Sequence, residues 1–185
     1  GPLRPDGLPF YVERLMPGCR VDSLDIVIRN SCDLRDEAAW RAYESNLSRH
    51  LYQAAFYQTP CTTFTGARRP AAGDGQNCPK RLRSSSGPGR YGVQGLTPQD
   101  TELVRDGTLL AVRTAAAMKL HLAMNVPFMY ETPERIQPGD PNMLDLDEFQ
   151  DILKDSRVIK KVVHQCMWGA RTTKPSILLL FLVPT

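Results

Sequence analysis

The chain has 185 residues, of which 42% are hydrophobic and 23% are charged, so it is long enough to form a sizeable core and is not disordered as a whole. Its 13 glycines and 15 prolines predict a single loop-rich domain over residues 1–185 and exclude collagen-like or low-complexity classes. The longest apolar run, Ile177 to Val183, is far shorter than the ~18 to 20 residues that a membrane span needs.

The five cysteines are odd in number and lack the paired spacing of a zinc site. His164 and Cys166 lie close together in sequence, but no second pair at ligand spacing accompanies them, so we predict no metal site. The amino terminus also lacks a basic start followed by an apolar run. We therefore expect an intracellular protein, nuclear or cytoplasmic.

Short apolar segments alternate with longer amphipathic ones, a pattern typical of a sheet with helices packed against it. In the first part of the chain the pattern predicts strands over Val21–Ile28 and Ala54–Tyr57. Between them, apolar residues spaced three or four apart predict a helix over Asp36–Tyr52.

The segment Gly66–Gly95 is rich in Gly, Pro, Ser, Arg and Lys, which predicts a long loop. The formal net charge of the chain is only +3, but this loop concentrates positive charge and contains a single acid, Asp74. Two interpretations stay open: a solvated insertion, or a loop that binds nucleic acid or another polyanion. The candidate nucleic-acid-binding residues are Arg68, Arg69, Lys80, Arg81 and Arg83, and Arg90 is a further basic residue of the loop.

A helix start follows the loop, with Thr97 as the cap, Pro98 at the first helical position and Asp100 three residues after the cap. This helix is expected to continue to about Met124. The remaining predicted elements are a strand at Val126–Tyr130, a helix at Leu146–Lys154, and strands at Val158–Val163 and Ile177–Val183.

Polar residues follow several of the predicted strands. Ligands in open α/β sheets bind at the carboxyl ends of the strands, so Cys61 and Glu131, which follow two of them, are expected to converge on one crevice. The alternatives are that Cys61 is a small buried residue, that Glu131 is solvated or caps a turn, and that Asp25 and Asp33 cap turns.

An ordered set of short motifs resembles the cytosine-5 DNA methyltransferase family, and more closely the methyltransferase-like domains of some large eukaryotic and mobile-element polyproteins. The Pro-Cys motif lies within Thr59–Thr65, the acid motif is Tyr130-Glu131-Thr132, and the late motif is Trp168-Gly169-Ala170-Arg171 with Lys174. Gly1–Gly7 resembles the end of the glycine-rich cofactor loop, and Val21–Ile26 and Asp33-Leu34 resemble the two following cofactor motifs.

The resemblance implies an α/β, Rossmann-like methyltransferase fold with a mostly parallel sheet flanked by helices. It implies Cys61 as the nucleophile that adds to cytosine, Glu131 as the acid at ring nitrogen 3, and Arg171 or Lys174 beside the exocyclic oxygen. S-adenosylmethionine would be the methyl donor, and a nucleic acid, DNA or RNA, the partner. The implied cofactor residues are Gly1, Asp6, Gly7, Asp25, Asp33 and Pro60.

The chain also departs from the family pattern. Nothing precedes Gly1, so the first strand of the sheet is absent or comes from a partner chain or another segment. Thr132 and Pro133 stand where the family has Asn and Val, and Ser176 replaces the second late arginine. Two functions are therefore expected as alternatives: a methyltransferase, or a catalytically inactive methyltransferase-like fold that binds nucleic acid or protein.

Overall fold

The computed structural model of the chain describes residues 8–24, 32–68, 80–168 and 175–183. The chain divides into two compact units, residues 1–46 and residues 47–185. No helix within the described ranges is long and apolar enough to span a membrane.

The first unit contains helix α1 (Leu8–Leu15) and most of helix α2 (Glu37–Ser48). Asp36 caps the amino terminus of α2, because its Oδ1 accepts a hydrogen bond from the backbone of Ala39 at 2.9 Å. The predicted strand Val21–Ile28 is wrong for residues 21–24, which form no strand, and its remainder lies outside the described residues.

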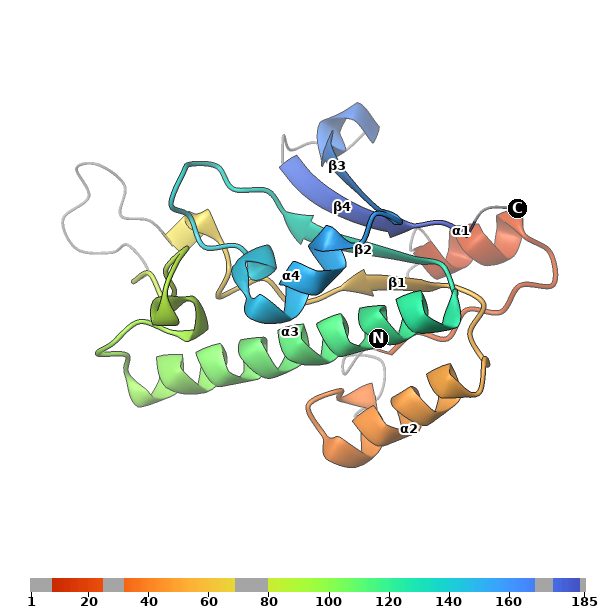
Figure 1. Cartoon of the computed structure of the whole chain (residues 1–185), viewed down its shortest axis with the longest axis horizontal. Coiled ribbons are helices and arrows are strands. Elements are labelled where there is room, and N and C mark those ends of the chain that lie inside the picture. The colour runs from red at the N-terminus through yellow and green to blue at the C-terminus, as the bar shows by residue number, and fades with distance from the viewer. Residues whose placement is uncertain (1–7, 25–31, 69–79, 169–174, 184–185) are drawn as a thin grey trace. The chain divides into compact units, whose positions relative to one another are not determined.

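The second unit contains a four-stranded sheet in the order β1-β2-β4-β3 (Figure 1). β1 pairs with β2 in parallel, whereas β4 pairs antiparallel with both β2 and β3. The bounds of the strands are β1 Ala55–Gln58, β2 Phe128–Pro133, β3 Val158–His164 and β4 Pro175–Phe181.

The strands therefore lie close to their predicted positions. The expectation of a mostly parallel sheet is wrong, because one strand pair is parallel and the other two are antiparallel. Only ten residues separate His164 from Pro175, which is too short for a helical crossover to a parallel neighbour. β4 instead returns between β2 and β3, so β1, β2 and β3 share one direction. Their carboxyl ends lie at the same edge of the sheet.

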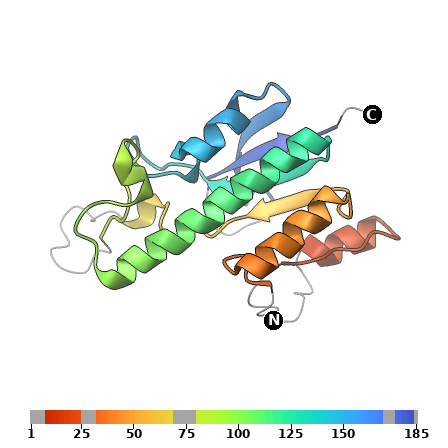
Figure 2. The same cartoon turned by 60° about the horizontal axis from the view of Figure 1, so that its bottom comes forward.

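Helices α3 (Pro98–Met124) and α4 (Asp147–Lys154) connect these strands and cover one face of the sheet (Figures 1 and 2). The predicted start of α3 is confirmed, since Thr97 Oγ1 accepts from the backbone of Asp100 at 3.1 Å. With 27 residues, α3 is about 40 Å long and extends beyond the strands at its amino-terminal end.

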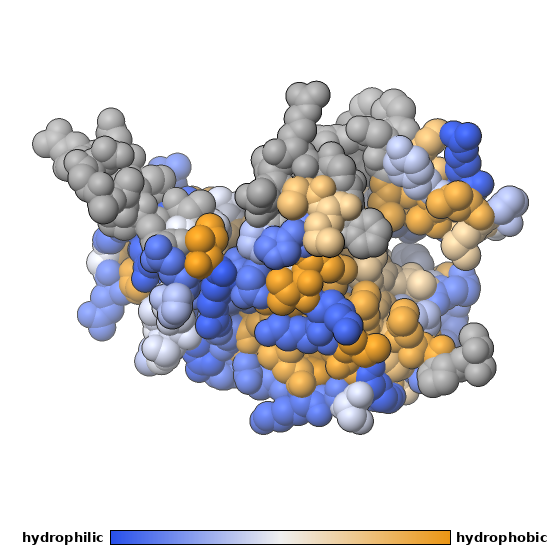
Figure 3. All heavy atoms as spheres, turned by 90° about the horizontal axis from the view of Figure 1, so that it is seen from above, coloured by the Kyte–Doolittle hydropathy of each residue, from blue (hydrophilic) through white to orange (hydrophobic). Residues whose placement is uncertain are grey.

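The core lies between these helices and the sheet. Tyr130 and Leu179, on neighbouring strands, are fully buried there together with Phe149 of α4. Because side chains alternate between the two faces of a strand, Glu131 points to the opposite face. Seen from above, on the side where β3 and β4 lie in Figure 1, the surface mixes apolar and hydrophilic side chains (Figure 3).

The loop predicted over Gly66–Gly95 contains two short 3-10 helices in its described part, and two more lie further along the chain. Their bounds are η2 Gly66–Arg68, η3 Pro88–Tyr91, η4 Met143–Asp145 and η5 Gln165–Trp168.

Candidate functional site

Cys61 and Glu131 come from the neighbouring parallel strands β1 and β2. Cys61 follows β1 as expected, whereas Glu131 lies within β2, two residues before its end, and does not follow the strand as predicted. Gln58, the last residue of β1, pairs with Glu131 in the register, and its Nε2 donates to Glu131 Oε2 at 3.1 Å. Cys61 follows three residues later. Burial raises the pKa of the Tyr130 hydroxyl, and the charges of Glu131 and Cys61 add to this rise.

Glu131 is a buried carboxylate, 7% exposed, that is held by donors from other strand ends. The hydroxyl of Ser176, near the start of β4, donates to Glu131 Oε1 at 2.5 Å. Gln165, directly after β3, donates through Nε2 to the Ser176 hydroxyl at 3.1 Å. Each carboxyl oxygen therefore accepts at least one hydrogen bond, as a buried polar group requires.

Cys61 is a free, half-buried cysteine in the turn that follows β1. Its carbonyl oxygen accepts a hydrogen bond from the backbone of Phe64 at 2.8 Å, which closes the turn. Two residues before it, the hydroxyl of Thr59 lies 2.8 Å from that of Thr114 on α3. Pro60 is exposed. The thiol is thus carried by a short segment that is fixed at both of its ends.

Arg83 does not lie on the surface as its assignment to nucleic-acid binding requires. Its side chain is fully buried, and the guanidinium stacks on the ring of Phe64 at 3.7 Å from the centroid. A residue without solvent contact cannot reach a phosphate, so this assignment is wrong. The cause is local folding: Arg83 turns inward against α3, although the surrounding composition is typical of an exposed loop.

The other described basic residues of the loop make contacts within the protein. Arg68 Nε donates to the carbonyl of Thr62 at 3.1 Å, and Lys80 Nζ donates to the carbonyl of Gly95 at 2.6 Å. Arg81 pairs with Asp140 at 3.3 Å. Lys80 is exposed, whereas Arg68 and Arg81 are half-buried. Arg69 lies outside the described residues.

Most residues assigned to the cofactor and to the late motif lie outside the described ranges, and these are Gly1, Asp6, Gly7, Asp25, Arg171 and Lys174. Asp33 is described and belongs to the first unit, where its Oδ2 pairs with Arg35 Nη2 at 2.8 Å. Binding of S-adenosylmethionine therefore stays a prediction from the sequence motifs.

The sequence interpretation missed Gln58 and Gln165 as partners at the site. Each is a polar residue at the end of a predicted or observed strand, which is the signal that could have identified them. Ser176 was noted only as the replacement of an arginine. Its contact with Glu131 depends on β4 lying beside β2, which the sequence pattern did not predict.

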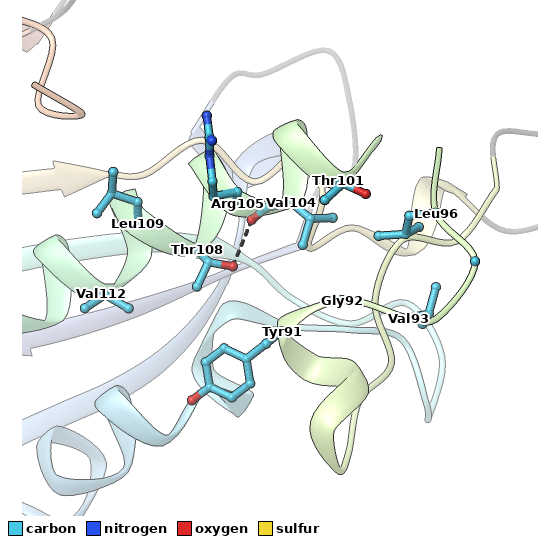
Figure 4. Close-up of a pocket in the computed structure, with 11 residues that line it drawn as sticks. Tyr91, Gly92, Val93, Leu96, Thr101, Val104, Arg105, Thr108, Leu109 and Val112 are labelled. Carbon is cyan, nitrogen blue, oxygen red and sulfur yellow. Dashed lines mark hydrogen bonds between the residues drawn. The ribbon is translucent and has the colours of Figure 1, made fainter. Parts of the chain in front are cut away.

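A separate groove of about 750 Å³ lies beside the amino-terminal half of α3 (Figure 4). Val93 and Leu96 line one side, and Val104, Leu109 and Val112 of α3 line the other. Its lining is mostly apolar and includes neither the cysteine nor the glutamate described above. The groove is thus distinct from the candidate site.

Comparison with known proteins adds no relative to this description, since no family model, no curated protein and no solved structure matches the chain.

Proposed function

We propose that the chain is a cytosine-5 methyltransferase-like module that acts on nucleic acid, with Cys61 as the nucleophile and Glu131 as the acid. The observation that carries this proposal is that the two residues belong to adjacent parallel strands: Cys61 follows β1 by three residues, and Glu131 of β2 accepts a hydrogen bond from Gln58, the last residue of β1. Three strands of one direction that end at a shared edge also support the methyltransferase-like sheet that the motifs imply.

The chemistry explains why these two residue types are needed together. Carbon 5 of cytosine is a poor nucleophile, so the Cys61 thiolate first forms a bond to carbon 6 and pushes an electron pair toward carbon 5. Proton transfer from Glu131 to ring nitrogen 3 neutralises the charge that this addition creates. The base has to be flipped out of a duplex, or arrive single-stranded, to reach both groups.

The methyl donor would be S-adenosylmethionine, whose sulfonium supplies an electrophilic methyl group. When bound, it would supply this methyl group to carbon 5 and would retain the electron pair of the broken bond as a neutral thioether. Loss of the carbon 5 proton to a base then expels the Cys61 thiolate, and return of the proton from nitrogen 3 to Glu131 restores the neutral aromatic ring. Among the described residues, this chain contributes the addition, the proton at nitrogen 3 and their alignment.

Ser176 and Gln58 fit a role in aligning Glu131. Their donors approach the two oxygens of one carboxylate, which fixes the plane of the group. A fixed carboxyl plane aims one oxygen at the base edge without loss of rotamer freedom during the reaction.

The test is covalent trapping with an oligonucleotide that contains 5-fluorocytosine, in the presence of S-adenosylmethionine. Fluorine at carbon 5 cannot leave as a proton does, so the Cys61 adduct accumulates and shifts the mass of the protein. Cys61→Ser should abolish the adduct. Cys166→Ser, which changes another free cysteine, should leave it intact.

Two results would contradict the proposal. One is an adduct that survives in Cys61→Ser, because the nucleophile would then be another residue. The other is the absence of any heat or thermal shift on titration with S-adenosylmethionine, together with no adduct on single-stranded or duplex substrates.

The inactive alternative has one observation in its favour. Both oxygens of Glu131 accept from donors within the protein, and one of these donors, Ser176, occupies the place of a family arginine. Binding of an oligonucleotide without S-adenosylmethionine binding and without an adduct would support this alternative.

A further inference from the structure

Arg83 connects three segments of the second unit that lie far apart in sequence. Nε donates to Thr63 Oγ1 at 3.0 Å, and Nη1 donates to the carbonyl of Arg90 at 2.9 Å. Nη2 donates to the carbonyl of Val104 at 2.7 Å and to Thr108 Oγ1 at 2.9 Å, both on α3. Every nitrogen of the guanidinium therefore has a partner.

All of these acceptors are neutral, which is unusual for a buried arginine. Removal of a charged group from water is costly, and an ion pair is the common compensation. Here the compensation comes from the hydrogen bonds of the planar guanidinium and from its stacking on the ring of Phe64. Burial lowers the pKa of Arg83 to about 10. The side chain keeps its proton at neutral pH and satisfies its donors only while all three segments stay in place.

The close packing of the same junction is also visible at Gly107 of α3. A Cβ atom built there would lie 2.9 Å from Thr63 Oγ1 and 3.3 Å from Arg83 Nη2. Helix α3 thus approaches the segment after Cys61 so closely that a side chain at position 107 would force a neighbour to shift. The Thr108 hydroxyl accepts from Arg83 and also donates to the Val104 carbonyl, so it links the arginine to the helix backbone (Figure 4).

We propose that Arg83 is a positioning residue that fastens the Cys61–Phe64 segment to α3 and so holds the Cys61 thiol at the edge of the sheet. The two residues that Arg83 contacts in this segment, Thr63 and Phe64, follow the cysteine by two and three residues. The Phe64 backbone in turn closes the turn at the Cys61 carbonyl. The catalytic consequence of this role rests on the proposed function, whereas the fastening itself does not.

The experiment compares wild type with Arg83→Met, which keeps much of the buried volume and removes the donors, and with Arg83→Lys, which keeps the charge without the fork. Arg105→Met is the matched control, an arginine of α3 that is 72% exposed and pairs on the surface with Glu102. Amide hydrogen exchange over residues 61–64 should accelerate at least about fivefold in Arg83→Met and stay unchanged in the control. Arg83→Lys should restore little of the protection, because an ammonium group cannot reach all four acceptors.

The second measurement is the rate at which Cys61 reacts. The rate constant for the 5-fluorocytosine adduct should fall about a hundredfold in Arg83→Met, with the affinity for S-adenosylmethionine unchanged, because misplacement of a nucleophile by about 1 Å has effects of that size. Alkylation of Cys61 by iodoacetamide, followed by mass mapping, reports the altered surroundings of the thiol without any nucleic acid. Arg105→Met should match wild type within about twofold in both assays.

Uniform loss of protection across residues 47–185, with no excess at 61–64, would overturn the proposal in favour of a general structural role. If Arg83→Met fails to fold, Gly107→Ala replaces it. This variant crowds Thr63 but keeps every hydrogen-bond donor and acceptor. Unchanged amide hydrogen exchange at residues 61–64 in Gly107→Ala would also overturn the proposal. If wild type forms no adduct, the proposed function fails, and hydrogen exchange and alkylation still decide the role of Arg83.

Discussion

Gly107→Ala is expected to destabilise the protein, although the same substitution usually stabilises a helix. Alanine in a helix interior is favoured over glycine by about 1 kcal/mol. At this position the added methyl group would lie 2.9 Å from Thr63 Oγ1, a distance that requires one side to move. Thr63 cannot shift alone, because its hydroxyl accepts the 3.0 Å hydrogen bond from Arg83 Nε.

The magnitude follows from two opposing contributions. An extra methyl group in a closely packed core costs about 1–3 kcal/mol, and the helix propensity returns about 1 kcal/mol of this. We therefore expect a net loss of about 1 kcal/mol in the free energy of unfolding. For a protein of this size that loss lowers the Tm by about 3 °C.

The assay is a double-mutant cycle with Thr63→Ala, followed by urea denaturation. Thr63→Ala removes the hydroxyl that the new methyl group would press on, so in that background Gly107→Ala should become neutral or stabilising. The expected coupling energy is about 1–2 kcal/mol. If Gly107→Ala raises stability equally in both backgrounds, the close contact of α3 with the Cys61–Phe64 segment does not exist in solution.

Three further predictions concern single side chains. His121 is fully buried, and burial lowers its pKa; the unfolded chain therefore binds a proton more readily, and stability is complete above about pH 6.5 and falls by up to about 1.4 kcal/mol per pH unit below it. Urea titrations at pH 7.5 and 5.5 should show this loss in wild type and not in His121→Phe, and equal losses would contradict it. Ser176→Ala removes a donor from buried Glu131 and should lower the unfolding free energy by about 1–3 kcal/mol; a change within about 0.5 kcal/mol would mean that the contact is replaced by water. Thr97→Ala removes the cap of α3 and should cost about 1 kcal/mol in the same assay, whereas an unchanged urea midpoint would show that the end of α3 frays without effect.

The sequence predicted best those features that depend on neighbouring residues. The cap at Thr97 and the end of α3 near Met124 are local signals, and both are confirmed. The strand at Ala54–Tyr57 is confirmed within one residue, since β1 covers Ala55–Gln58. These elements follow from apolar spacing and capping chemistry within a few residues.

The features that depend on distant contacts were not predicted. The position of β4 between β2 and β3 depends on which strands pair. A run of apolar residues predicts a strand but does not show whether it pairs in parallel or antiparallel. The residues around Arg83 in sequence have the composition of a solvated loop. Only the packing of this loop on α3 shows that the Arg83 side chain is buried. Cys61 and Glu131 were expected to follow two strands; Cys61 does follow β1, whereas Glu131 lies within β2 and pairs in register with Gln58. Their convergence on one crevice stays a prediction.

The reversed course of β4 also sets the order in which the molecule can assemble. In the described part of the chain, β3 pairs only with β4, so β3 cannot join the sheet before β4 has formed. Ser176, which holds Glu131, arrives with that strand. During synthesis the glutamate and the cysteine leave the ribosome well before their final support, and the site becomes complete only when residues 175–181 are free to fold.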